Sequence, residues 1–268
     1  MFLEDCLILE NRHIAGQNYL MRLKSEKAVE ASKAGQFFML KCENRIYSLR
    51  RPISLHYADK EKKELEFYYE VKGGGTKEFA QMKAGETINI QGPLGHGFST
   101  EMEGKELMVV GGGMGMAPMK LLIEVLSKKN KVTFIAGGRN AEAVEILSNF
   151  KLDGVDLHIT TDDGTAGTKG NVIVKMEELM QNKKFDMVFT CGPHKMMEAV
   201  AKTSSKYNTE CEISLEERMA CGVKACVGCS IKTKAGMKKV CHDGPVFKAE
   251  TIVDLDPVVE RTETCCGN

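Results

Sequence analysis

The sequence predicts a chain of three parts: a small antiparallel β barrel over residues 1–100, a doubly wound α/β domain over residues 101–210, and a small arm over residues 211–268. In the first part, short β-branched and aromatic stretches alternate with turn signals, a spacing typical of small barrels. In the second, apolar strands alternate with helical stretches, which predicts a parallel sheet. The third is rich in cysteine and has little room for a core of its own.

Five stretches of the first part have the composition of barrel strands. They are Leu7–Leu9, Asn18–Leu23, Gln36–Leu40, Leu65–Val71 and Thr87–Ile90. Before the fifth stretch, Lys72-Gly-Gly-Gly-Thr76 leads into a short predicted helix. This turn either presents backbone N–H groups to a phosphate or is a plain glycine turn with Thr76 as the N-cap. In Arg50-Arg-Pro-Ile-Ser54, an arginine fork suits a phosphate and the proline suits a strand edge.

The second part contains four predicted parallel strands, each followed by a predicted helix. The strands are Leu107–Val110, Val132–Ala136, Asp156–Thr160 and Asp186–Thr190. The helices are 116–126, 142–148, 172–180 and 195–206. Open sheets of this kind bind ligands at the carboxyl ends of their strands. Cys191 lies at such an end, where it either faces a ligand or is a buried apolar thiol.

A glycine-rich run, Gly111-Gly-Gly-Met-Gly-Met-Ala-Pro118, follows the first of these strands and opens a helix. Small residues let the backbone approach a pyrophosphate, and the start of a helix supplies N–H groups and a positive dipole. The run departs from G-x-G-x-x-G, so taken alone it is a weak sign of a dinucleotide site.

The arm contains Cys221, Cys226, Cys229 and, after eleven residues, Cys241. The order C-x4-C-x2-C…C is that of a plant-type [2Fe–2S] site, which passes single electrons. The alternative is structural zinc, but zinc prefers two close C-x2–4-C pairs, which the x4 step fits poorly. The spacing therefore favours the cluster. For Cys265 and Cys266, beside the terminus, we expect disordered thiols rather than a second metal site.

Composition excludes several classes of function. Lys and Arg number 37, as do Asp and Glu, so the formal net charge is zero and a nucleic-acid partner is not expected. No apolar run reaches membrane-spanning length, and an acidic pair near Met1 argues against a secretory signal. Ten cysteines without such a signal indicate reduced thiols in the cytoplasm.

The order R-x-x-S, G-T, G-G-G-x-G-x-A-P and C-G-P resembles the ferredoxin-NADP reductase superfamily. With the C-terminal cysteines and the following D-G-P-V-F, the chain is similar over essentially its whole length to electron transfer subunits of type B dihydroorotate dehydrogenase. The resemblance implies a ferredoxin reductase-like fold in which the barrel binds FAD, the α/β domain binds NAD and the arm holds a [2Fe–2S] cluster.

The resemblance also implies roles for individual residues. Arg51 would bind the FAD phosphates and Ser54 would lie near the flavin ring, while Cys191 would lie beside the site of hydride transfer. The other residues implied for FAD are Pro52, Ile53, Tyr68, Tyr69, Glu70, Gly75 and Thr76. Those implied for NAD are Gly111, Gly112, Gly113 and Gly115. The four arm cysteines match the cluster ligands, whereas Met114 and Met116 stand where β-branched residues are common.

The implied electron route runs from dihydroorotate to FMN in a catalytic partner, then to the cluster, FAD and NAD. Because the chain shows no dihydroorotate site, we expect a heterotetramer of two copies of each subunit. Apolar residues near the cluster, Val223, Val227, Ile231 and Val246, would face the partner. NAD is expected rather than NADP, although Arg139 could meet a 2′-phosphate.

Two other readings remain open at this point. One is the small subunit of a NAD(P)H-linked ferredoxin oxidoreductase or sulfide dehydrogenase, in which an Asp replaces one cluster cysteine. The other, from a different class, is a zinc-stabilised binding module without catalytic function. Four cysteines favour the dihydroorotate dehydrogenase subunit over the first, and colour from flavin and cluster would separate it from the second.

Overall fold

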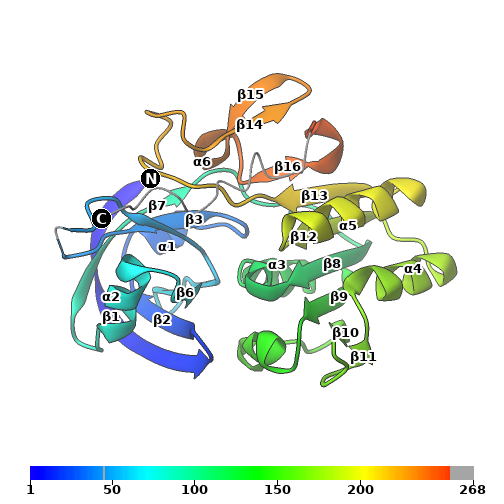
Figure 1. Ribbon diagram of the computed structural model, residues 1–268, viewed down its shortest axis with the longest axis horizontal. Coiled ribbons are helices and arrows are strands. Elements are labelled where there is room, and N and C mark those ends of the chain that lie inside the picture. Colours follow the sequence, from blue (N-terminus) through cyan, green and yellow to red (C-terminus); the bar gives the residue numbers. More distant parts are fainter. Residues whose placement is uncertain (45, 254–268) are drawn as a thin grey trace, which may run out of the picture.

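The computed structural model of the protein describes residues 1–44 and 46–253, and Cys265 and Cys266 lie outside them. The barrel and the α/β region stand next to each other, and the arm lies across the top of both (Figure 1). Within the described residues, no helix is long and apolar enough to cross a membrane.

The first part is one antiparallel sheet in the order β4-β3-β7-β1-β2-β6-β5. Its strands are β1 (Phe2–Ala15), β2 (Asn18–Lys24), β3 (Phe37–Leu40), β4 (Arg51–Ser54), β5 (Tyr57–Asp59), β6 (Glu64–Glu70) and β7 (Thr87–Leu94). The two edge strands, β4 and β5, are consecutive in the chain, so this single segment curls the sheet into a partial barrel. Two short helices, α1 (Ala28–Ala31) and α2 (Gly74–Gln81), complete it. The predicted antiparallel fold and its five strands are confirmed.

Strand β6 directs its two faces to different neighbours, because successive side chains of a strand point to opposite sides. Leu65, Phe67 and Tyr69 are buried in the barrel, where Tyr69 meets the ring of Phe79 edge-on. Glu66 alternates with them and pairs with a lysine of the α/β region. One strand therefore builds the barrel core and the seam between the two parts.

The second part is a sheet in the order β11-β10-β9-β8-β12-β13-β16, parallel except for β16. Its strands are β8 (Glu106–Gly112), β9 (Lys131–Gly138), β10 (Asp156–Thr161), β11 (Thr168–Lys169), β12 (Met187–Cys191), β13 (Glu210–Ser214) and β16 (Val246–Lys248). The helices are η1 (Gly113–Met116), α3 (Met119–Leu126), η2 (Glu142–Asn149), α4 (Val172–Asn182) and α5 (His194–Lys206). The four predicted parallel strands and the doubly wound order are confirmed.

Three features differ from the prediction. The helix predicted over 116–126 divides into a 3₁₀ turn and α3, because Pro118 lacks an N–H and restricts the residue before it. The helix predicted over 142–148 is also 3₁₀. Strands β13 and β16, most of which the sequence reading places in the arm, are hydrogen-bonded into the α/β sheet.

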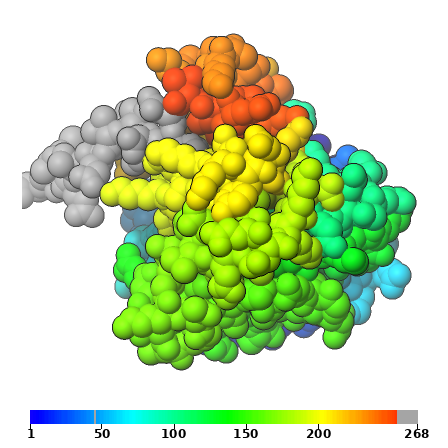
Figure 2. Space-filling view, turned by 90° about the vertical axis from the view of Figure 1, so that its right-hand side faces the viewer, coloured from blue at the N-terminus to red at the C-terminus, as the bar shows by residue number. Residues whose placement is uncertain are grey.

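The arm comprises β14 (Ser230–Thr233), β15 (Gly236–Lys239), α6 (Val240–Asp243), β16 and η3 (Ala249–Thr251). Figure 2 shows it in orange and red above the yellow residues of the α/β region. Its buried residues, including Cys229, Val240 and Cys241, share a core with Met39 and Leu94 of the barrel and with the α/β sheet. The arm is thus packed against both larger parts.

Helix α3 locks the α/β region onto the barrel. Lys120 Nζ lies 2.7 Å from Glu66 Oε2, and these side chains are only 8% and 16% exposed. The same ammonium lies 4.7 Å from the centre of the Tyr57 ring. Nearby, Nδ1 of the fully buried His56 lies 2.6 Å from the carbonyl oxygen of Ala117. Burial, and secondarily Lys120, lowers the pKa of His56 to about 3, so this imidazole stays neutral.

We predict that Glu66→Gln lowers the free energy of unfolding by about 3 kcal/mol, because it leaves the buried Lys120 charge without its partner. Urea unfolding followed by circular dichroism measures the effect. The matched control is Glu26→Gln, which removes the exposed Lys63–Glu26 pair and should leave stability almost unchanged. Equal effects in both variants would contradict a locking role for the buried pair.

Candidate functional site

A cavity of about 770 Å³ opens at the carboxyl ends of β8, β9, β10 and β12. Its wall includes Gly112, Gly113 and Gly115 of the glycine-rich run, together with Gly192. Sheet order reverses between β8 and β12, so this is the switch point at which doubly wound folds bind ligands. The cavity has the position and size for a dinucleotide.

Two glycines are required by the shape of this loop. Gly113 has a φ of +53°, a left-handed conformation that other residues adopt at a cost. A Cβ on Gly115 would lie 2.4 Å from the backbone of Cys191, so only glycine lets the η1 turn approach the end of β12 this closely. Because these glycines have no side chains, the space above the loop stays open to a ligand.

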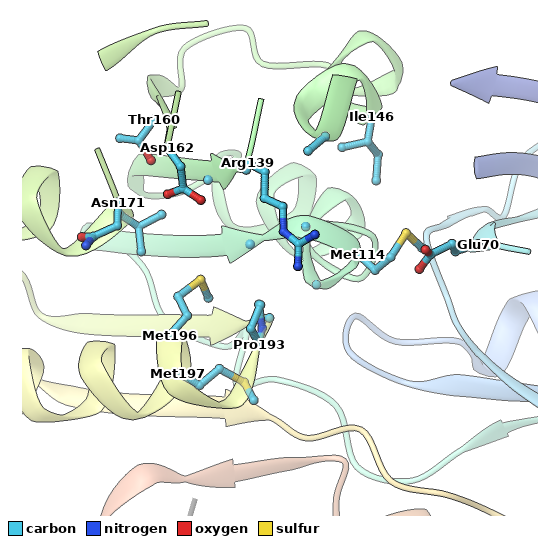
Figure 3. A pocket seen from close by; sticks show the side chains of 18 of the residues that line it. Glu70, Met114, Arg139, Ile146, Thr160, Asp162, Asn171, Pro193, Met196 and Met197 are labelled. Carbon is cyan, nitrogen blue, oxygen red and sulfur yellow. The ribbon is translucent and has the colours of Figure 1, made fainter. Parts of the chain in front are cut away.

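Arg139 and Asp162 carry opposite charges on the wall of this cavity (Figure 3). Asp162 is held in place by its loop, because its N–H donates to the Gly138 carbonyl at 3.1 Å. The neighbouring Asp163 has a structural task instead. The hydroxyl and N–H of Thr165 donate to its carboxylate and hold the pKa of Asp163 below its ordinary value.

A second cavity of about 230 Å³ lies between the barrel and the segment after β13. Of the nine residues expected to bind FAD, eight line it. They are Arg51, Pro52, Ile53, Ser54, Tyr68, Tyr69, Glu70 and Thr76. Gly75 does not line it, but a Cβ there would lie 2.4 Å from Arg51 Nε, so its smallness makes room for the arginine.

Arg51 is held over the ring of Tyr47, with 5.7 Å between the guanidinium carbon and the ring centre. Its Nη1 donates to the carbonyl oxygen of Leu49 at 2.5 Å. The adjacent Arg50 instead donates to Met39 and Asn89 and fastens β3 to β7. Of the two arginines, therefore, Arg51 is the one available to a phosphate.

Thr76 is not the N-cap of α2, contrary to the plain-turn interpretation. The helix is capped at Gly73, and Thr76 lies three residues further on. Its Oγ1 accepts hydrogen bonds from the N–H groups of Lys72 and Gly73, at 3.0 and 3.2 Å. The hydroxyl thus fixes the glycine turn at the edge of the second cavity.

The two cavities meet at a common wall, whose residues line both. They are Tyr68, Glu70, Lys72, Met114 and Glu216. Glu216 follows β13 and is an exposed residue of this common wall. Desolvation by the surrounding protein raises the pKa of Glu216, whereas Lys72 and His194 act to lower it. A ligand in one cavity can therefore touch a ligand in the other at this wall.

Cys191 ends β12 and is only 2% exposed. Among the described residues that line the two cavities, neither Cys191 nor Gly111 appears. Burial strongly raises the pKa of the Cys191 thiol, with a smaller contribution from Glu216, so the sulfur is a neutral thiol. This position favours packing beneath the cavity floor over thiolate chemistry.

The four arm cysteines approach one another as two pairs. Cys221 is within hydrogen-bonding reach of Cys226, and Cys229 of Cys241. Burial disfavours a thiolate at Cys221, but the N–H groups of Cys226 and Val223 each donate to its Sγ at 3.4 Å, and the pKa falls to about 7. Burial raises the pKa of Cys241 to about 11.

This donor set fits a two-iron cluster, which takes two thiolates on each iron and N–H donors toward its sulfurs. Within residues 1–44 and 46–253, no three or more His, Cys, Asp or Glu side chains are placed to hold a single metal ion.

Two residues of the site escaped the sequence reading. Tyr47 lies in a loop whose pattern carries no signal. Glu216 could have been found, because it follows a parallel strand at the ligand-binding edge of the sheet, but β13 itself was not recognised.

Two segments of the chain match known families. Residues 109–202 match the family described as the oxidoreductase NAD-binding domain, and residues 216–253 match the iron–sulfur cluster binding domain of dihydroorotate dehydrogenase B. Fold and site together thus define an NAD-linked oxidoreductase subunit with an iron–sulfur arm.

Curated relatives narrow this class. The chain is 39% identical to the dihydroorotate dehydrogenase B (NAD(+)) electron transfer subunit of Caldanaerobacter subterraneus subsp. tengcongensis, over 92% of this chain and 96% of the relative. It is 36% identical to the subunit of the same name from Streptococcus pneumoniae strain R6, over 94% and 98%. The chain belongs to the family of dihydroorotate dehydrogenase B electron transfer subunits.

Solved structures share the fold. An NADH-dependent reduced ferredoxin-NADP oxidoreductase studied for flavin-based electron bifurcation superposes with a TM-score of 0.85, at 28% identity over 94% of this chain and 90% of that one. A ferredoxin NADP+ reductase from Neisseria gonorrhoeae gives 0.62, at 21% identity over 76% and 91%. The ferredoxin reductase-like fold is confirmed.

We predict that Asp162→Ala raises kcat/KM for NADPH relative to NADH by about tenfold, because it removes a carboxylate that would repel a 2′-phosphate near Arg139. Arg139→Ala should lower the use of NADPH instead. Steady-state dye reduction with each nucleotide measures both ratios. Asp153→Asn, which removes an acidic residue outside the cavity, is the control, and an unchanged ratio in Asp162→Ala would contradict the role.

Proposed function

We propose that this chain passes electrons from the FMN of a catalytic dihydroorotate dehydrogenase subunit, through its [2Fe–2S] cluster and FAD, to NAD+ in pyrimidine biosynthesis in the cytoplasm. The observation that carries the proposal is the common wall of the two cavities, with the cluster loop fastened beside it. When bound, FAD accepts electrons singly or in pairs and so links a one-electron cluster to a two-electron nicotinamide.

The second cavity is the proposed FAD site. Arg51 would bind the phosphates. Its guanidinium lies over the ring of Tyr47, and the absence of a side chain at Gly75 leaves room for it. The N–H groups at the start of α2 would bind the same phosphates, since Thr76 of its first turn lines the cavity. Ser54 and Tyr68 would border the flavin ring, since both line the cavity.

The first cavity is the proposed NAD site, with Gly112, Gly113 and Gly115 against the pyrophosphate. Its nicotinamide end would lie at the common wall, where Met114 and Glu70 stand at one end of Figure 3. Cys191, proposed at first beside the hydride, would support this floor from beneath, since its thiol is buried.

The cluster loop begins at the wall of the proposed FAD site. Met219 lines the second cavity and Cys221 follows two residues later, a separation of at most roughly 7 Å of chain. The loop also packs against the barrel, because a Cβ on Gly222 would lie 2.7 Å from Met39. Bound at Cys221, Cys226, Cys229 and Cys241, the cluster would lie close to the flavin without entering its cavity.

The cluster loop also offers a surface for the catalytic subunit. Val223 and Val227 are 40% and 73% exposed, although Val246 is buried in β16 and Ile231 is partly buried. Exposed apolar side chains beside a redox centre suit a protein partner. We place the FMN subunit here, in a heterotetramer with two copies of each chain.

Arg51→Ala should weaken FAD binding by about 2–3 kcal/mol, or roughly 30- to 150-fold, because it removes a charge-assisted contact to phosphate. Arg51→Lys should restore part of the affinity, since lysine lacks the planar fork. Flavin fluorescence across a dilution series measures the dissociation constant. Arg22→Ala, on β2 and outside the second cavity, is the control. Equal constants for Arg51→Ala and wild type would exclude Arg51 as the phosphate ligand.

Reconstitution tests the function as a whole. The chain alone should oxidise NADH with dyes and show no activity toward dihydroorotate, while mixing it with the FMN subunit should give dihydroorotate-dependent NAD+ reduction. Cys226→Ser should abolish the coupled reaction and the cluster absorption but leave NADH-dye activity, because the FAD site is separate. Dihydroorotate oxidation by the chain alone, or fully loaded subunits that never couple, would refute the proposal.

A further inference from the structure

Reduction of NAD+ by this route requires a proton at the common wall. A hydride consists of two electrons and one proton, but an iron–sulfur cluster delivers electrons alone. Each NADH formed therefore needs one proton from water, taken up where the two cavities meet. This requirement rests on the proposed function, and some side chain on the wall has to meet it.

Of the five residues that line both cavities, most are poor proton carriers. Met114 has no ionisable proton. Tyr68 is a weak acid, because burial raises its pKa to about 12. Lys72 and Glu70 neutralise each other in an ion pair of 3.1 Å. Glu216 is left, an exposed acidic residue that lines both cavities.

The surroundings of Glu216 suit a group that gains and loses a proton. Desolvation raises its pKa above the ordinary value for Glu, although the residue is exposed on the cavity wall. The charged or titratable groups that act on it are Lys72 from the β6–α2 turn, Glu70 from β6 and His194 from the start of α5. His194 lines the wide first cavity, which connects this carboxyl with water.

We propose that Glu216 carries this proton between water and the flavin. In the direction of NAD+ reduction, two electrons arrive singly from the partner through the cluster, and Glu216 gives one proton to the flavin. The two electrons and that proton leave together as hydride to NAD+, and Glu216 is reprotonated from the cavity. In the reverse direction, Glu216 accepts the proton that is left when electrons depart through the cluster.

Glu216→Gln in the loaded heteromer separates the steps, since glutamine keeps the shape but cannot exchange the proton. Hydride transfer from NADH to flavin, followed by stopped-flow absorbance, needs no added proton and should keep its rate. Electron passage from the reduced flavin to the cluster should slow by about 100-fold and lose its solvent deuterium isotope effect. Glu210→Gln, on the exposed side of β13, should behave as wild type.

A second measurement does not depend on turnover. Infrared titration of the FAD-loaded chain should show a protonated carboxyl band that persists above the ordinary titration range of Glu, near pH 4.3, and disappears in Glu216→Gln. Equal slowing of hydride transfer and electron passage would make Glu216 a positioning residue and overturn the proposal, as would unchanged rates. Failure of the wild-type heteromer to reduce NAD+ with dihydroorotate would instead refute the proposed function.

Discussion

The period of β6 is the constraint on which the other features depend. Leu65, Phe67 and Tyr69 fill the barrel, while Glu66 and Tyr68 turn to the opposite face. A register shift of one residue would exchange these sets, bury charge in the barrel and remove Lys120's partner. The same shift would take Tyr68 from the common wall of both cavities. The alternation of side chains along β6 therefore specifies the barrel core, the contact with the α/β region and part of the cavity wall.

The arm depends on the same assembly. It has few apolar residues of its own, and it is stable because β16 extends the α/β sheet while Gly222 packs against Met39 of the barrel. Gly95 and His96 hold it from the barrel side, where the His96 N–H donates to Gly244 at 2.5 Å. Since the arm contacts both larger parts, the cluster loop keeps a fixed position relative to each.

Much of the fold follows from local pattern. Alternation and turn signals are sufficient for the barrel strands, and buried apolar runs predict the parallel strands from β8 to β12. Strand β13 was missed because its Cys211-Glu-Ile-Ser214 is short and mixed in polarity, and it becomes buried only when Ser99 donates to Glu212 and β16 pairs beside it. Glu216 was missed for the same reason, because its position at the ligand-binding edge of the sheet can be recognised only once β13 is known.

The relative positions of the two cavities and the cluster cysteines suit the transfer of hydride, electrons and protons. Hydride moves only between atoms in contact, so the two cavities have to share a wall, and the close approach of Gly115 to Cys191 opens the space for it. Single electrons can cross packed protein, and the cluster cysteines accordingly lie behind Met219 rather than in the cavity. Protons need neither contact with NAD nor a path through the cluster, but they do need water. A carboxyl at the edge of the open first cavity meets that need without exposing the flavin site.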